Sequence, residues 1–180
     1  MTKNRMAAGV LGGLLLSMGV AVQASAADAA KDPRVERGRY LVVVSGCNDC
    51  HTPGYMQNGG PKLPEKDWLT GVPVGYQGPW GTTYASNLRL VINGLSEAQW
   101  LAHARREFKP PMPWFNLREM TDQDLKAIYA YVRSLGAAGE TAPAYVAPGG
   151  KVKTPYFVFV PQVDPPQAAA RGGRIRAGSR

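Results

Sequence analysis

Residues 47–51 read Cys47-Asn48-Asp49-Cys50-His51, a C-x-x-C-H motif that contains both cysteines of the 180-residue sequence. Two thiols at this spacing can add to the two vinyl groups of one porphyrin, while the next side chain reaches the iron from the same side. A chance match or a redox-active C-x-x-C pair is the alternative interpretation. The adjoining histidine and the lack of other cysteines favour one covalently attached haem c, with Cys47 and Cys50 as thioether anchors and His51 as the first axial ligand.

Residues 1–26 have the pattern of a secretory signal peptide. Lys3 and Arg5 precede an apolar run over 7–22, and Ala24-Ser25-Ala26 follows as a small-x-small cleavage site. An uncleaved membrane anchor is the alternative, but the run is shorter than the ~20 residues that span a bilayer and is diluted by glycine. We therefore expect an exported, periplasmic protein whose haem domain covers residues 27–139.

The chain is basic, with a formal charge of +8 that falls by two if Lys3 and Arg5 leave with the signal peptide. A basic surface favours acidic partners, and it also occurs in proteins that bind nucleic acid or anionic membranes. The predicted export and the scattered positions of the basic residues argue against nucleic acid. Residues 168–180 hold four arginines among Gly and Ala and are predicted to form a disordered tail.

Helix signals lie on both sides of a Gly- and Pro-rich region over residues 52–88. Asp32-Pro33 predicts the start of a helix that runs into the C-x-x-C-H motif. A capping box over Ser96–Gln99 begins a helix over about 97–108, and the same device over Thr121–Asp124 begins a last helix that ends at 135. Gly38 in the first helix would let Tyr129 or Tyr131 of the last helix cross it closely.

The segment after residue 139 is rich in proline, which excludes a long helix. We expect an extended strap over 140–167, in which Tyr156–Val160 is the strongly β-prone run. A strap that packs along the domain surface is the simpler interpretation. A docking arm for a partner subunit is the functional alternative.

The second axial ligand decides between an electron carrier and a reactive haem. The candidates are Met56, Met112, Met120 and His103. Met56 follows His51 too closely to reach the far face, Met120 is explained as a helix staple, and His103 as a surface residue. Met112 lies in Pro110-Pro111-Met112-Pro113-Trp114, a stiff loop far enough along the chain to cover that face. It is the predicted ligand, and a core-filling methionine is the alternative.

With these residues in place, the sequence resembles a class I cytochrome c domain, and in particular the cytochrome domains that accompany periplasmic dehydrogenases. The resemblance spans about 35–135 and rests on the haem motif, the Met112 loop, and the segments 78–88 and 120–131. It implies a mainly α fold around one covalently bound haem, with long Gly/Pro-rich loops. It also implies that Trp80, Tyr84 and Asn87 belong to the haem pocket.

The resemblance implies two further contacts of the haem site. The second ring nitrogen of His51 needs an acceptor, and a backbone carbonyl in the following loop is expected, with Pro61 as the candidate. A haem propionate needs donors, for which the candidates are Trp80, Tyr84 and Arg89.

The predicted function is single-electron transfer by a monohaem cytochrome, from a periplasmic dehydrogenase toward the respiratory chain. The chain alone is not expected to be an enzyme, and no small-molecule substrate is expected. Two alternatives remain: a haem enzyme or gas or peroxide sensor with an open or labile sixth position, and a cytochrome subunit held permanently in an enzyme complex. Redox partners are expected to carry acidic surfaces. These would dock on basic residues of this chain: Lys62, Lys66, Arg105, Arg106 and Lys109.

Overall fold

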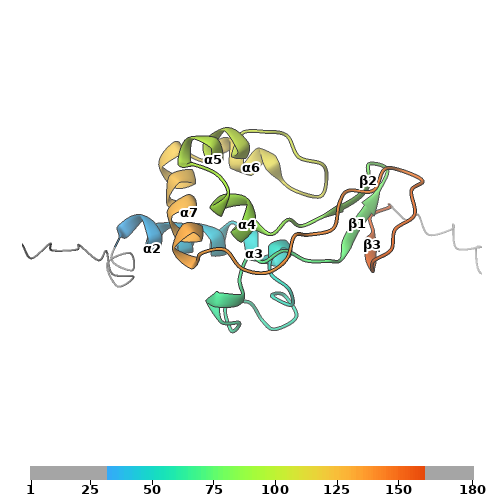
Figure 1. The fold of residues 1–180 in the computed structure, drawn as a ribbon, viewed down its shortest axis with the longest axis horizontal. Helices are drawn as coiled ribbons and strands as arrows, with labels where there is room; N and C mark the ends of the chain where they lie inside the picture. Colours follow the sequence, from blue (N-terminus) through green and yellow to red (C-terminus); the bar gives the residue numbers. More distant parts are fainter. Residues whose placement is uncertain (1–31, 161–180) are drawn as a thin grey trace, which may run out of the picture.

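The computed structural model describes residues 32–160, so the predicted signal peptide, the predicted tail and the end of the strap lie outside it. Helices dominate this part of the chain, and a small sheet lies at the opposite end from the longest helices (Figure 1). The helices are α2 (Pro33–Val44), α3 (Cys47–His51), α4 (Leu88–Asn93), α5 (Glu97–Ala104), α6 (Trp114–Glu119) and α7 (Asp122–Leu135), with a 3₁₀ turn η1 (Glu65–Asp67). The strands are β1 (Gly75–Gly78), β2 (Gly81–Tyr84) and β3 (Tyr156–Val158). The prediction of a mainly α cytochrome c fold is confirmed.

Helix α2 begins where the sequence predicts. The Asp32 carboxylate accepts a hydrogen bond of 2.9 Å from the Arg34 backbone N–H, and Pro33 occupies the first helical position. The helix ends at Val44, and Gly46 then adopts a left-handed conformation with φ of 68°. This turn directs the chain into α3 without a long connection.

Helices α2 and α7 cross at Gly38, and the crossing forms the centre of the helical half. A β-carbon placed on Gly38 would lie 2.7 Å from Tyr131 Cβ and closer still to the carbonyl oxygen of Ala127. The close approach therefore requires glycine. The predicted crossing is confirmed with Tyr131, whereas the hydroxyl of Tyr129 donates to the carbonyl of Leu95.

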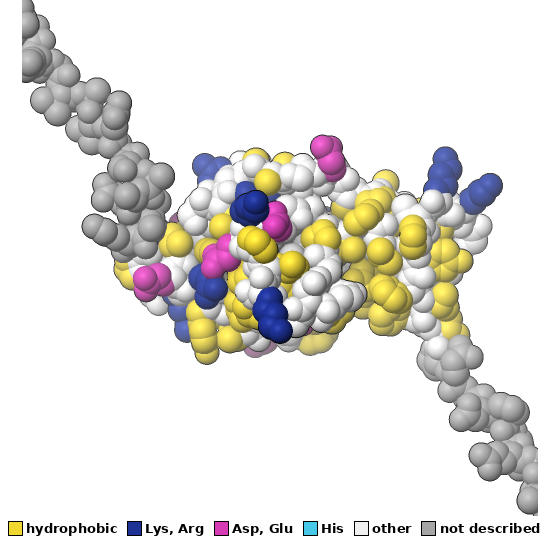
Figure 2. All heavy atoms as spheres, turned by 90° about the horizontal axis from the view of Figure 1, so that it is seen from below, with side chains coloured by type: hydrophobic (Ala, Val, Ile, Leu, Met, Phe, Trp, Pro, Cys, Tyr) yellow, Lys and Arg dark blue, Asp and Glu magenta, His cyan; other side chains and the backbone are white. Residues whose placement is uncertain are grey.

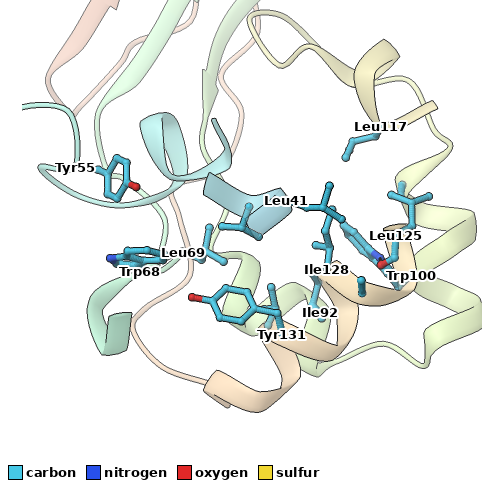
Figure 3. Packing of buried hydrophobic residues seen from close by; sticks show 14 residues of the cluster. Leu41, Tyr55, Trp68, Leu69, Ile92, Trp100, Leu117, Leu125, Ile128 and Tyr131 are labelled. Carbon is cyan, nitrogen blue, oxygen red and sulfur yellow. Dashed lines mark hydrogen bonds between the residues drawn. The ribbon is translucent and has the colours of Figure 1, made fainter. Parts of the chain in front are cut away.

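The core surrounds this crossing (Figure 3). Thr121 and the Ser96–Gln99 capping box begin α7 and α5 as predicted. The Trp100 indole N–H donates to the Leu125 carbonyl over 2.8 Å, which joins α5 to α7. Further buried side chains of the cluster come from α2, the loop after α3, α4, α6 and α7: Leu41, Val42, Tyr55, Trp68, Leu69, Ile92, Leu117, Ile128 and Val132.

Helix α5 ends at Ala104, earlier than the predicted end at about 108. The reason lies in Arg105, whose guanidinium donates to the carbonyls of Leu117 and Arg118 and pairs with Asp122. These bonds hold the chain beside α6, and Pro110 a few residues later disfavours a helical conformation before it. The prediction of a helix to 108 is therefore wrong by about one turn.

The sheet joins the strap to the middle of the chain. β1 and β2 form an antiparallel hairpin, and β3 lies parallel to β1 with Tyr76 opposite Phe157. The other edge of the hairpin meets the strap through a bridge between Thr82 and Val146. The β-prone run is thus a strand, and the strap runs along both edges of the hairpin. No helix within residues 32–160 is long and apolar enough to cross a membrane.

Candidate haem site

Helix α3 is a single turn that carries the whole C-x-x-C-H motif. Cys47 and Cys50 are one turn apart, so their side chains project from the same side of the helix. Both are free thiols with no disulfide between them, and both are partly exposed. Burial raises the pKa of Cys47 to about 11, which keeps its thiol protonated at neutral pH. Both thiols are therefore free to add to the two vinyl groups of a porphyrin.

His51 ends α3 with only 8 % of its surface exposed. Its Nδ1 lies 2.7 Å from the carbonyl oxygen of Ser86, and an oxygen acceptor requires that Nδ1 carries the proton. Nε2 therefore holds the lone pair and makes no hydrogen bond to any residue of the described chain. Burial lowers the pKa of His51, opposed by its hydrogen bond to Ser86, and favours the neutral form that binds metals.

The acceptor is Ser86, so the expectation of Pro61 is wrong. The loop after the motif leaves α3 through Thr52, whose hydroxyl accepts from the Leu69 N–H over 2.7 Å. The His51 carbonyl in turn accepts from the Gly71 N–H over 2.8 Å. These bonds turn the loop back, and the segment after β2 rather than the early loop reaches the imidazole.

Met112 lies between α5 and α6, half-buried against the core. The hydroxyl of Thr83 donates to the carbonyl of Pro110 over 2.7 Å, which attaches this loop to β2. The Met112 carbonyl accepts from the Trp114 N–H over 2.9 Å as α6 begins. The loop is thus fixed on both sides of the thioether.

The other candidate ligands have different surroundings. Met56 is 60 % exposed in the loop after α3. Met120 packs against the core at the start of α7. The ring of His103 lies 6.1 Å from Trp100 and 5.3 Å from Phe108, on the flank of α5. Exposure explains the position of the first side chain and packing explains the other two, so none of the three needs a role as an iron ligand.

The residues assigned to the pocket by resemblance make specific contacts. The Trp80 indole donates to the Tyr76 carbonyl, and the Tyr84 hydroxyl lies 2.8 Å from that of Thr154 in the strap. Asn87 caps α4 by accepting from the Leu90 N–H, and its amide donates to carbonyls of the segment after α7. Their contribution to the haem pocket stays a prediction.

Arg89 has a role that the sequence did not reveal. It is 4 % exposed, and its guanidinium donates to the carbonyls of Lys66, Leu135 and Gly136. These bonds close the C-terminal end of α7 and attach it to the loop before β1. These bonds engage each nitrogen of the guanidinium with the chain itself, and a role of Arg89 as a propionate donor stays a prediction. The Leu135–Gly136 helix end was the signal that a buried cation could be needed there.

Tyr76 on β1 is a second residue that sequence reasoning missed. Burial, together with an interaction with the Cys50 side chain, raises the pKa of Tyr76 above its usual range. No motif marks this tyrosine, which lies opposite Phe157 of the strap.

Among the basic residues proposed for docking, Lys62, Lys66, Arg106 and Lys109 are exposed. Arg105 is committed to the α5–α6 connection described above. The ammonium of Lys109 lies 4.8 Å above the ring of Tyr145. Lysine and arginine side chains are spread over the face shown in Figure 2 and do not form one continuous stripe.

The donor set fits a covalently bound haem. Two free thiols on one turn can form the thioether bonds, and a neutral imidazole with a free Nε2 can bind the iron. Met112 is half-buried in the loop between α5 and α6, and its role as the second ligand stays a prediction.

Comparisons with known proteins agree with this site. The family model described as cytochrome c matches residues 35–136, so the chain belongs to the cytochrome c family, whose members bind haem c covalently. It is 28 % identical over 139 residues to the fructose dehydrogenase cytochrome subunit of Gluconobacter japonicus. It is 27 % identical over 122 residues to a subunit of the nicotinate dehydrogenase of Pseudomonas putida.

These similarities cover parts of the proteins. The first covers 69 % of this chain and 24 % of the relative, and the second covers 61 % and 9 %. The chain therefore matches a small part of each curated relative. No solved structure matches it at a comparable level. Membership of the cytochrome c family supports an electron-transfer role for the chain.

Proposed function

We propose that the chain is a monohaem electron carrier in which His51 and Met112 ligate the iron. The observation that carries the proposal is the 2.7 Å contact between His51 Nδ1 and the Ser86 carbonyl, which leaves Nε2 as the coordinating atom beside the two thiols. A haem c bound here would supply a one-electron iron couple. A second ligand from Met112 would keep the coordination number constant on reduction and favour the ferrous state.

The surrounding residues support fast outer-sphere transfer over catalysis. Ser86 fixes the orientation of the imidazole, and Thr83 holds the Met112 loop through the Pro110 carbonyl. The second histidine, His103, packs between Trp100 and Phe108 and is not placed as a distal acid or base. Such a site exchanges electrons without binding a small-molecule substrate.

The setting we propose is the periplasm, with a dehydrogenase as electron donor and the respiratory chain as destination. The signal-peptide pattern of residues 1–26 and the similarity to dehydrogenase cytochrome subunits support it. Exposed Lys62, Lys66 and Arg106 would attract acidic partner surfaces. Residence as a permanent subunit of such an enzyme is compatible with the same chemistry.

The optical spectrum of the ferric holoprotein tests the ligand set. We expect a weak long-wavelength sulfur-to-iron charge-transfer band in the wild type, its loss in Met112→Ala, and its retention in Met56→Ala. Met56 is the matched control because it is an exposed methionine outside the loop. A wild type without the band, with a high-spin spectrum that changes on addition of cyanide, would overturn the proposal in favour of a reactive haem.

Small redox reagents of opposite charge test the basic docking surface. We expect oxidation by anionic ferricyanide to slow as ionic strength rises, and oxidation by a cationic cobalt complex to accelerate, since salt screens attraction and repulsion alike. Rates that do not change with salt for either reagent would contradict this part of the proposal.

A further inference from the structure

The sheet presents two faces of different character. Directly paired residues share a face, and successive residues alternate between faces. Thr83, Tyr76 and Phe157 are paired across the three strands and lie on one face. Gln77 and Val158 are paired on the other face, where Val158 lines a shallow groove together with Gln77.

Aromatic rings collect on the face that carries Tyr76. The Tyr76 ring lies 6.0 Å from Phe157 and 5.8 Å from Phe159, and the Trp80 ring lies 6.3 Å from Phe159. We call Tyr76, Trp80, Phe157 and Phe159 the aromatic face. Two of its four members come from the strap. Hydrophobic side chains also gather at this end of the molecule in Figure 2.

The aromatic face extends from one side of the haem site to the other. At one side the chain leaving β2 reaches the haem motif, because the Ser86 carbonyl accepts a hydrogen bond of 2.7 Å from His51 Nδ1. At the other, Thr83 on the same face bonds to the Pro110 carbonyl, two residues before Met112. The strap strengthens this second connection, because the Tyr145 hydroxyl donates to the Trp80 carbonyl and the Tyr145 ring lies under Lys109.

We propose that the aromatic face is a wall of the haem site, so that the C-terminal strap completes the cofactor pocket through Phe157 and Phe159. The wall lies between the end of β2, which leads to Ser86 beside His51, and the loop of Met112, and it excludes water from that edge. The inference deepens the proposed function because it requires haem at the C-x-x-C-H motif. It does not depend on Met112 being the sixth ligand.

The wall has a definite effect on the iron. Ferric haem carries one more positive charge than ferrous haem, and an apolar, water-excluding wall disfavours that charge. Phe157 and Phe159 therefore raise the midpoint potential. Polar replacements on this face admit water and lower the potential, whereas the same replacements on the opposite face do not.

The test compares two double variants of the full-length holoprotein on the same strand. Phe157→Ser/Phe159→Ser opens the aromatic face, and Tyr156→Ser/Val158→Ser alters the opposite face. Phe157 and Val158 are 55 % and 60 % exposed, so the two changes remove similarly accessible side chains. The midpoint potential and the rate of reduction by dithionite are measured for each, with the charge-transfer band recorded in parallel.

We expect a lower potential and faster dithionite reduction in the first variant, and wild-type values in the second. Phe157→Leu/Phe159→Leu, which keeps the face apolar, should restore a potential near that of the wild type. If the serine variant fails to fold, Tyr76→Phe and the leucine variant still test whether potential follows the chemistry of this face. Equal potentials in all variants, or equal shifts from both faces, would overturn the inference. A missing charge-transfer band with a normal effect of the aromatic face would instead count against Met112 ligation.

Discussion

The two ends of the molecule use aromatic side chains in opposite ways. At the helical end, Trp100 and Tyr131 are buried, and their polar atoms are satisfied by Leu125 and Glu65 within the chain. At the sheet end, Phe157 and Phe159 leave about half of their surface exposed, at 55 % and 43 %. The helical end therefore covers these two aromatic side chains with other residues of the chain. The sheet end is built to present apolar surface to something else, and four changes test this contrast.

The largest effect is expected from adding a methyl group where α2 and α7 cross. Gly38→Ala places a methyl group against the backbone of Ala127, and we expect a loss of about 3 kcal/mol or more in the free energy of unfolding. Chemical denaturation followed by far-UV circular dichroism measures it. Gly94→Ala is the control, because its new methyl group meets only the carbonyl oxygens of Leu90 at 3.3 Å and of Val91 at 3.6 Å, and we expect a change below about 1 kcal/mol. Similar losses at both positions would show that the crossing is not specially tight.

The second-largest effect is expected from removing the buried guanidinium of Arg89. Arg89→Met leaves the carbonyls of Lys66, Leu135 and Gly136 without their donor, at an expected cost of about 2–4 kcal/mol. Exposed Arg106→Met serves as the control and should cost almost nothing. Hydrogen exchange at the end of α7 should accelerate in the first variant. Unchanged exchange there would contradict the role of Arg89 in closing this helix.

The third change loosens the sheet end and leaves the helical end intact. Thr83→Val with Tyr145→Phe removes two hydrogen bonds that secure the Met112 loop and the Trp80 carbonyl, each worth about 1 kcal/mol. We expect cyanide to bind the ferric protein more tightly, by about fivefold for each kcal/mol by which the loop is loosened. Tyr156→Phe removes a hydroxyl of the same strap and is the control. Unchanged cyanide affinity would mean that these bonds do not secure the ligand loop.

The smallest effect is a pH dependence at the helical end. Burial, with Arg106 nearby, lowers the pKa of His103 below 6.5. The unfolded chain then takes up this proton at a higher pH than the folded chain. Stability is therefore full above about pH 6.5 and declines as the pH falls through that value toward the lower folded pKa. His103→Gln should flatten the slope of unfolding free energy between about pH 7.5 and about pH 5.5. An unchanged slope would assign the pH dependence to other groups.

The helical end could be predicted because its signals are local. Asp32, the Ser96–Gln99 capping box and Thr121 each satisfy N–H groups within one turn, so residue spacing alone reveals them. Gly38 was recognisable because only a close crossing explains a glycine on that helix face. The C-x-x-C-H motif was equally local, and its covalent chemistry fixed the family.

The remaining features depend on contacts between distant segments. Helices α4 and α6 are six residues each, too short to be stable without tertiary contacts, and they were not predicted. Ser86 follows the β1–β2 hairpin and lies 35 residues beyond His51, so no local pattern reveals their contact. The pairing of Tyr76 with Phe157 joins positions 81 residues apart and leaves no local pattern. Sequence therefore predicted the motif and the helices better than the surroundings of the cofactor.

The parallel pairing of β1 with β3 also sets an order of assembly. β3 is the last element of the described chain to leave the ribosome, and its partner strand precedes it by most of the domain. The long sequence separation makes this pairing costly in entropy, so we expect it to form after the local helices. The hairpin thus lacks Phe157 and Phe159 beside it while the chain is incomplete. We therefore expect the C-terminal strand to be the last element of the described chain to join the fold.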